Sequence, residues 1–226
     1  MDKRHGISYL FSMDNDSSSS KDLAPSGLDA PLSLHVSDTA TADTAIDDTK
    51  DAPRESSQEH EHVVVIFGGG HIAQEVAAQA AHVGFTVDVL DSREAYAQAE
   101  RFPAARQVLH CGDYAFFDAT YPVGARHYAV ILTHSHAADQ TLLEALLPTA
   151  ARYIGVIGSM RKKEAMFSAL RRHGVPDAEL ACVRCPIGVP IGPESPEEVA
   201  ISIVAELIAA RSGCLPPPRP PRPPRC

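Results

Sequence analysis

The sequence lacks the features that would point to a membrane protein, a disulfide-stapled protein or a nucleic-acid-binding protein. No apolar run reaches the roughly 20 residues that a membrane-spanning helix needs. The five cysteines are scattered and odd in number, which favours a reducing cytoplasm over a disulfide framework. The formal net charge of −9 argues against nucleic acid as the main partner. No apolar stretch follows the first residues, so no secretory signal is visible and we expect a cytoplasmic protein.

Composition divides the 226 residues into three parts. Residues 1–60 form an acidic segment that is rich in Ser, Asp and Thr. It has too few apolar side chains to offset the entropy cost of ordering, so we predict disorder. Residues 61–213 carry periodic apolar patterns and are long enough for one core. Residues 214–226 are rich in proline and arginine, which predicts an extended, solvated tail.

The most informative stretch is Phe67-Gly-Gly-Gly-His-Ile-Ala73, which ends a β-branched apolar run. A helical pattern follows directly, so the sequence predicts a strand, a tight turn and a helix. Gly68, Gly70 and Ala73 have the G-x-G-x-x-A spacing of dinucleotide-binding turns. The first glycine permits the turn, the second lets a phosphate approach, and the alanine allows close packing. Free N–H groups at the helix start would face the phosphate, and the predicted binding residues are Gly68, Gly69, Gly70 and His71.

The second predicted strand, Phe85–Leu90, runs into Asp91. An acidic residue there, about 20 residues after the glycines, usually holds the ribose of a dinucleotide. Arg93 follows two residues later and could instead meet a 2′-phosphate or a second anionic group. Glycine triplets also occur in ordinary turns, so an α/β fold that binds no nucleotide is the alternative.

Predicted strands and helices alternate along residues 61–213. Tyr128–Leu132 is apolar throughout, which is typical of a central parallel strand buried on both faces. Alternation with short joints indicates an α/β fold with a doubly wound, mainly parallel, Rossmann-like sheet. Ligands of such sheets bind beyond the carboxyl ends of the strands. The predicted strands are Val63–Phe67, Phe85–Leu90, Arg106–Leu109, Tyr128–Leu132 and Tyr153–Ile157. The predicted helices are His71–His82, Ala137–Leu147, Met160–His173 and one that begins after Ser195 and fades near Arg211.

Two further loops at that edge carry candidate ligand contacts. Thr133-His-Ser-His136 follows the central strand, and its histidines could contact a ligand, belong to loop structure that Ser135 caps, or hold a metal. Ligand contact is favoured, and no metal site is predicted. Gly158-Ser-Met-Arg161 opens a helix that could hold a second phosphate, or could simply be capped with a solvated basic face. The candidate residues here are Thr133, His134, His136, Gly158, Ser159 and Arg161.

Two other motifs are less specific. Cys182 and Cys185 have C-x-x-C spacing but no second pair for zinc, so an ordinary pair of thiols is favoured over a persulfide carrier or a thiolate ligand near a soft metal. Residues 186–194, with two glycines, could fold over the site or form a packing turn.

Several motifs in register carry a resemblance to a known family. They are Phe67-Gly-Gly-Gly-His-Ile-Ala73, Asp91-Ser-Arg93, Arg101-Phe-Pro103, Thr133-His-Ser-His136, Tyr153-Ile-Gly-Val-Ile-Gly-Ser159, Pro186-Ile-Gly-Val-Pro-Ile-Gly192 and Ser195-Pro-Glu-Glu198. Over residues 62–211 the chain closely resembles the C-terminal Rossmann-like domain of the XdhC/CoxI family. These proteins are maturation factors for xanthine dehydrogenase and related molybdenum hydroxylases. Full-length members also carry a small N-terminal domain with a Gly- and Cys-containing signature, which residues 1–60 do not resemble.

The resemblance implies an accessory role, more a cofactor chaperone than an enzyme, and no catalytic residue is predicted. Such a protein would hold molybdenum cofactor (molybdopterin or its dinucleotide form), assist its sulfuration and deliver it to an apo molybdenum hydroxylase. A cysteine desulfurase would be a second partner, and a homodimer is considered because dimers are common in such folds. Two alternatives stay open, an NAD(P)-dependent oxidoreductase and a nucleotide-sensing interaction module. The first requires a proton donor, and the sequence has no Tyr-x-x-x-Lys pair.

Overall fold

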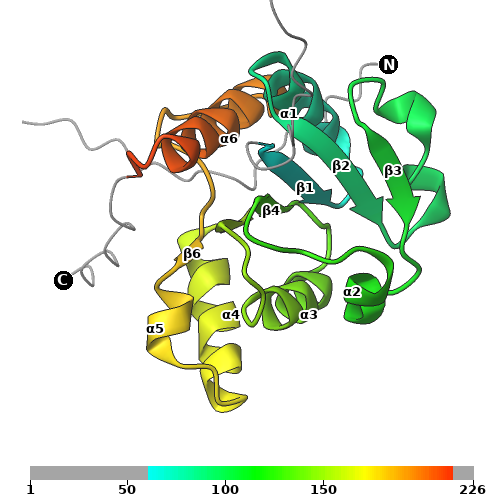
Figure 1. The fold of residues 1–226 in the computed structure, drawn as a ribbon. Helices are drawn as coiled ribbons and strands as arrows, with labels where there is room; N and C mark the ends of the chain where they lie inside the picture. The colour runs from blue at the N-terminus through cyan, green and yellow to red at the C-terminus, as the bar shows by residue number, and fades with distance from the viewer. Residues whose placement is uncertain (1–60, 216–226) are drawn as a thin grey trace, which may run out of the picture. The chain divides into compact units, whose positions relative to one another are not determined.

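One parallel sheet organises the protein, whose computed structural model describes residues 61–215. Its six strands lie in the order β3-β2-β1-β4-β5-β6 (Figure 1). All five pairings are parallel, which confirms the predicted doubly wound, Rossmann-like fold. The predictions for residues 1–60 and for the tail from residue 216 lie outside the described residues. The strands are β1 Val63–Phe67, β2 Thr86–Asp91, β3 Gln107–His110, β4 His127–Ile131, β5 Tyr153–Val156 and β6 Val183–Arg184.

The helices confirm the predicted alternation, with ends that differ by about one residue. The main helices are α1 His71–His82, α3 His136–Leu146, α4 Met160–Arg172 and α6 Pro196–Arg211. The shorter elements are η1 Glu94–Tyr96, η2 Ala99–Arg101, η3 Tyr114–Phe116, α2 Phe117–Thr120 and α5 Asp177–Leu180. Between residues 61 and 215, no helix combines the length and apolarity needed to cross a membrane.

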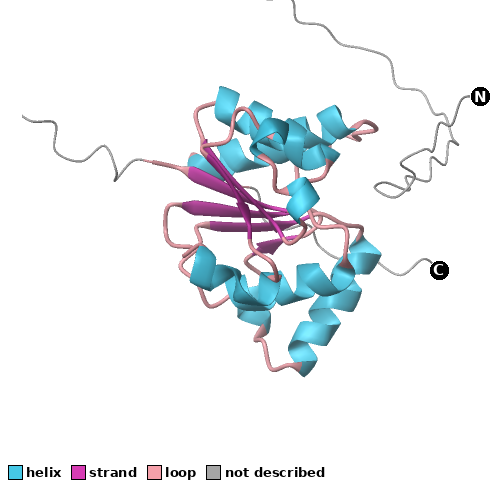
Figure 2. Ribbon diagram, turned by 90° about the vertical axis from the view of Figure 1, so that its right-hand side faces the viewer, coloured by secondary structure: helices cyan, strands magenta, loops and turns pink. Residues whose placement is uncertain are grey.

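The sheet separates two hydrophobic clusters, and Figure 2 shows helices on both of its sides. Val64 and Ile66 of β1 belong to the cluster with α1 and α6. Val63, Val65 and Phe67 belong to the cluster with α3 and α4. The whole of β1 is buried, which explains why this strand has no polar position. The strand order reverses between β1 and β4, so the ligand-binding edge of this fold lies beyond their carboxyl ends.

The segment that precedes α6 packs on that helix. The Val189 amide donates to the Ser202 carbonyl at 3.1 Å, and the Ser202 hydroxyl donates to the Val189 carbonyl at 2.6 Å. A Cβ on Gly188 would lie 2.4 Å from the Ser202 hydroxyl, so only glycine fits this contact. Of the two interpretations of residues 186–194, these contacts support the packing turn.

The start of α6 is fixed by a capping box, as the sequence pattern predicts. The Ser195 hydroxyl accepts from the Glu198 amide at 3.3 Å, and the Glu198 carboxylate accepts from the Ser195 amide at 3.2 Å. These bonds satisfy two backbone donors that the helix itself cannot.

Replacing Ser195→Ala removes one half of this box, so we expect the free energy of unfolding to fall by about 1 kcal/mol. Urea unfolding measures the change. Ser168→Ala, at an exposed position inside α4, is the matched control and should change stability by less than about 0.5 kcal/mol. Equal effects of the two variants would contradict a stabilising role for the cap.

Candidate functional site

Four loops meet at the carboxyl edge of the sheet. Parallel pairing sets Phe67 of β1 level with Leu90 of β2 and Ile131 of β4, and Ile131 level with Val156 of β5. The loops that follow these strands begin near Gly68, Asp91, Thr133 and Gly158. The structure therefore gathers at one edge the segments that the sequence singles out.

The three glycines of the first loop have different roles. Gly68 has φ +107°, and a Cβ there would lie 2.7 Å from the Leu132 carbonyl, so the turn requires glycine. A Cβ on Gly69 would lie 2.4 Å from the Tyr96 carbonyl. Gly70 has ordinary extended dihedrals, and a Cβ there would meet nothing within 4 Å. Gly68 and Gly69 are thus demanded by packing, whereas the space beside Gly70 is open to a ligand.

The helix that follows the turn begins without a cap from any side chain. Gly70 occupies the N-cap position of α1, and the first turn of the helix carries no acidic residue. His71, the first helical residue, is exposed. Such a helix start presents free N–H groups and partial positive charge, which suit a phosphate or another anion.

Asp91 anchors the glycine turn. Its carboxylate is fully buried and accepts from the Gly69 amide at 2.6 Å and from the Arg93 amide at 2.8 Å. The Arg93 guanidinium donates to both carboxylate oxygens, at 3.0 and 2.9 Å. Burial would raise the pKa of Asp91, but the bonds from the Arg93 side chain and from the Gly69 and Arg93 amides lower it below its ordinary value. Protein donors therefore occupy both oxygens of the residue that sequence reasoning assigned to a ribose.

Two arginines lie beside the turn. The Arg93 guanidinium stacks 3.6 Å from the centre of the Tyr96 ring. Arg101 reaches the turn from η2, where it donates to the Gly69 carbonyl at 3.1 Å and lies 5.1 Å from the same ring. Sequence reasoning named Arg93 as a binding residue. Arg101 belongs to the Arg101-Phe-Pro103 motif of the family resemblance but was not predicted to bind a ligand, because no local pattern shows that the loop folds back over the glycines.

A second buried carboxylate organises the end of β4. The Thr133 hydroxyl donates to Asp139 at 2.6 Å, and both side chains are buried. Asp139 also forms an ion pair with Lys162 of α4, whose ammonium donates to the Ile157 carbonyl at 2.9 Å. Thr133 therefore connects β4 to α3 and, through Asp139, to α4. Ser135 caps α3, as the sequence suggested, by accepting from the Ala138 amide at 3.4 Å.

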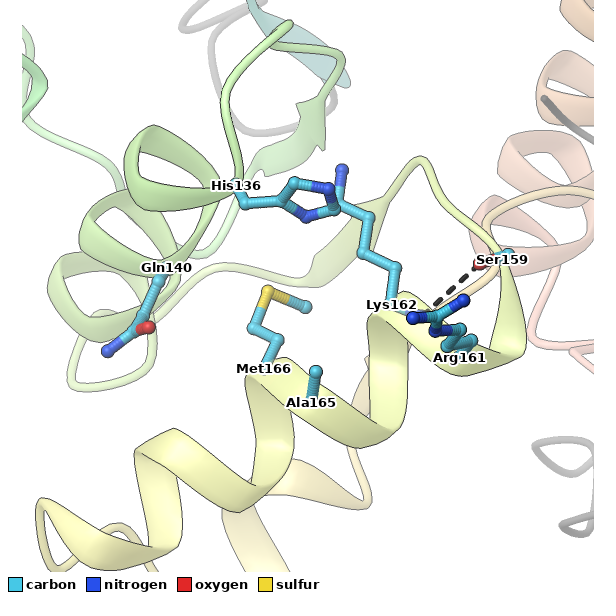
Figure 3. A pocket seen from close by; sticks show the side chains of 7 residues that line it. All are labelled: His136, Gln140, Ser159, Arg161, Lys162, Ala165 and Met166. Carbon is cyan, nitrogen blue, oxygen red and sulfur yellow. Dashed lines mark hydrogen bonds between the residues drawn. The ribbon is translucent and has the colours of Figure 1, made fainter.

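A cavity of about 520 Å³ lies between α3 and α4 (Figure 3). It brings together three of the predicted residues, namely His136, Ser159 and Arg161. Gly68–His71, Asp91, Arg93, Thr133, His134 and Gly158 do not line it. Sequence reasoning missed that Gln140, Ala165 and Met166 share this cavity, since they become neighbours only when α3 packs on α4. His134 is exposed, and no group of His, Cys, Asp and Glu within residues 61–215 could hold a metal ion.

The C-x-x-C cysteines lie in different environments. Cys185 is buried, which raises the pKa of its thiol to about 11 and keeps it protonated at neutral pH. Cys182 is exposed and donates to the Ala178 carbonyl at 3.5 Å. Both are free thiols, and the burial of Cys185 makes it unreactive.

The space around two neighbouring glycines predicts different effects when each is replaced. Gly69→Ala drives a Cβ into the rigid Tyr96 carbonyl, so we expect it to lower the free energy of unfolding by about 2 kcal/mol. Gly70→Ala adds the same atom in open space and should change stability by less than about 0.5 kcal/mol. Thermal and urea unfolding distinguish the two, and equal destabilisation would contradict the different roles of these glycines.

The pKa of Asp91 makes a pH-dependent prediction. Because the folded-state pKa lies below the unfolded value of about 3.9, its stabilisation is present above that pH and lost as pH falls through the folded pKa. We expect Asp91→Asn to lower stability by about 2 kcal/mol at pH 7, with the difference from the unmodified protein shrinking below about pH 4. Urea unfolding of both proteins at several pH values between about pH 3 and pH 7 measures this difference in stability.

Asp177→Asn is the control for that series. The Asp177 side chain is 76% exposed and pairs with Arg171 at 2.7 Å, so its loss should cost less than about 1 kcal/mol. An Asp91→Asn effect that is independent of pH would contradict the role of the carboxylate charge.

The comparisons with known proteins agree on one family. A family model described as the XdhC Rossmann domain matches residues 64–207. The chain is 34% identical over 154 residues to a probable subunit of xanthine dehydrogenase from Bacillus subtilis (strain 168), covering 66% of this chain and 42% of that protein. It is 28% identical over 149 residues to the uncharacterized protein YqeB of Escherichia coli (strain K12), covering 66% of this chain and 27% of that protein.

A solved structure supports the same relationship. A crystal structure of a xanthine dehydrogenase from Bacillus halodurans matches with a TM-score of 0.59 and 30% identity, covering 68% of this chain and 43% of that one. The chain thus spans less than half the length of these relatives. The family match runs from β1 into α6, across the whole sheet and the glycine turn at its edge. On that evidence the chain belongs to the XdhC family, through its Rossmann domain.

Proposed function

We propose that this chain is an accessory factor in the maturation of a molybdenum hydroxylase of the xanthine dehydrogenase kind. Membership of the XdhC family and the name of the Bacillus subtilis relative support this role. Its proposed partners are the apo-hydroxylase and a cysteine desulfurase. Its proposed ligand is molybdenum cofactor or a related nucleotide, held while sulfur is added and before insertion into the target enzyme.

The observation that carries the ligand proposal is the open start of α1. Gly70 leaves space beside backbone N–H groups that no side chain caps. Asp91 fixes the turn through the Gly69 amide, so these donors are held in place before a ligand arrives. Arg101 adds positive charge nearby and is held by the Gly69 carbonyl, whereas the charge of Arg93 is paired with Asp91. This donor set fits a phosphate.

The described residues suit the metal-bearing end of molybdenum cofactor less well than they suit its phosphate. A soft metal prefers thiolate ligands, and the molybdenum of the proposed cofactor would supply the redox chemistry of the hydroxylase. Cys185 is buried and protonated, and Cys182 lies on the surface of the domain. We therefore assign only the phosphate-bearing end to this domain, at Gly70, His71 and the first turn of α1.

The oxidoreductase alternative has one observation in its favour, the dinucleotide-type turn itself. The carboxylate that would hold a ribose is already bonded to Gly69 and Arg93, and the sequence has no Tyr-x-x-x-Lys pair. The accessory role is therefore the better supported function.

The role in maturation is tested by removing the protein from cells that make the hydroxylase. We expect hydroxylase activity to fall severalfold while the amount of apo-enzyme stays normal, because delivery rather than folding is lost. Activity and immunoblotting on the same extracts measure the two quantities. Intact activity in the deletion strain would contradict the proposal.

The location of the ligand is tested by Gly70→Val. A branched side chain fills the space beside the first turn of α1, so affinity for a phosphate-bearing ligand should fall at least about tenfold. Gly124→Val is the control, since a Cβ there makes only an ordinary 3.9 Å contact with the His127 ring and lies near the amino end of β4. Calorimetric titration with guanosine 5′-monophosphate (GMP) measures both, and unchanged affinity in Gly70→Val would exclude this turn from the site.

A further inference from the structure

We infer that the cavity between α3 and α4 is a second ligand site, which takes a phosphomonoester of an aromatic heterocycle. The inference rests on the proposed function only for this ligand class. The cavity measures about 520 Å³, within the range of small-molecule sites. Its lining residues are His136 and Gln140 of α3 with Ser159, Arg161, Lys162, Ala165 and Met166 at or within α4.

The cationic end of the cavity is defined by Arg161. Lys162 also lines the cavity, but the buried carboxylate of Asp139 neutralises its ammonium. Arg161 has no ion-pair or hydrogen-bond partner within residues 61–215, and the first turn of α4 contains no acidic residue. Arg161 therefore contributes the uncompensated positive charge, and its planar guanidinium matches two oxygens of a phosphate.

Ser159 lies beside that charge. Its hydroxyl oxygen accepts from the Lys162 amide at 3.2 Å, which leaves the hydroxyl proton free to donate. Figure 3 shows Ser159 next to Arg161, and a phosphate between them would receive bonds from both.

The remainder of the cavity suits a flat, partly apolar ring. Met166 and Ala165 form its apolar wall, and Figure 3 shows Met166 between Gln140 on one side and Arg161 on the other. A thioether adapts to the face or edge of an aromatic ring. The Gln140 amide nitrogen donates to Glu144 at 3.0 Å, so its carbonyl oxygen remains as an acceptor for a ring N–H. Along the cavity, the carbonyl acceptor of Gln140 is thus followed by the apolar wall and then by the Arg161 cation.

A chain of buried contacts connects this cavity to the glycine turn. Gly68 packs against the Leu132 carbonyl, and the next residue, Thr133, bonds to Asp139. Asp139 in turn holds Lys162 in the cavity wall. Both sites are therefore built on the end of β4, while their ligand contacts come from different helices.

The test is calorimetric titration of the full chain with GMP, guanosine and inorganic phosphate. We expect GMP to bind at two sites, and Arg161→Gln to weaken one of the two binding events at least about tenfold while leaving the weaker guanosine binding unchanged. Lys163→Gln is the matched control, because it removes the same charge from a nearby residue, which lines a different hollow with Phe167. Its GMP affinity should stay within about twofold. Ala165→Trp, at an exposed position, should fill the cavity and abolish binding at this site.

Several outcomes would overturn the inference. They are an absence of GMP binding, equal effects of Arg161→Gln and Lys163→Gln, or GMP binding that depends on Gly70 and is indifferent to Arg161 and Ala165. The last result would leave the proposed phosphate site at the glycine turn intact. The converse, dependence on Arg161 without dependence on Gly70, would support this inference and remove the glycine turn as the ligand site.

Discussion

The buried carboxylate of Asp91 is the constraint on which the rest of the carboxyl edge depends. It fixes the Gly69 amide and the Arg93 guanidinium together, and its charge is retained because these donors replace the water lost on burial. With Gly69 held, the Gly68 turn lies against Leu132 at the end of β4, and α1 begins at Gly70 with its first donors free. The geometry of the proposed phosphate site thus follows from one ion pair beneath it.

The same arrangement occurs once more across the switch point of the sheet. Asp139 is also fully buried and also holds a basic side chain, Lys162, at the edge where α4 begins. In both places a buried carboxylate fixes the position of one basic side chain, Arg93 beside Asp91 and Lys162 beside Asp139. The cost of burying each charge is offset only while its partners stay in place, which favours a single, ordered edge. Preorganisation of this kind lowers the cost of binding the anionic ligand that we propose.

Local patterns predicted the features that depend on local physics. The apolar runs gave the strands, and the caps at Ser135, Ser159 and Ser195 all occur, because each needs only a hydroxyl within three residues of a free amide. The glycine spacing correctly predicted the turn. Close packing requires glycine at positions 68 and 69, however, and not at position 70. Tertiary contacts decided the rest. Arg101 above the turn, the Asp139–Lys162 pair and the cavity beside Met166 join residues whose sequence separation hides their proximity. Asp91 was expected to face a ribose, and only the structure shows that the protein already occupies its oxygens.

The most direct measurement is native mass spectrometry of the protein purified from cells that synthesise molybdenum cofactor. We expect a mass increment that matches molybdopterin or its dinucleotide form, lost in a variant whose glycine turn is filled at Gly70. A nicotinamide or adenine nucleotide in its place would contradict the maturation role and favour an oxidoreductase or a nucleotide-sensing module. A protein that carries no ligand from such cells would contradict the claim that this domain holds the cofactor.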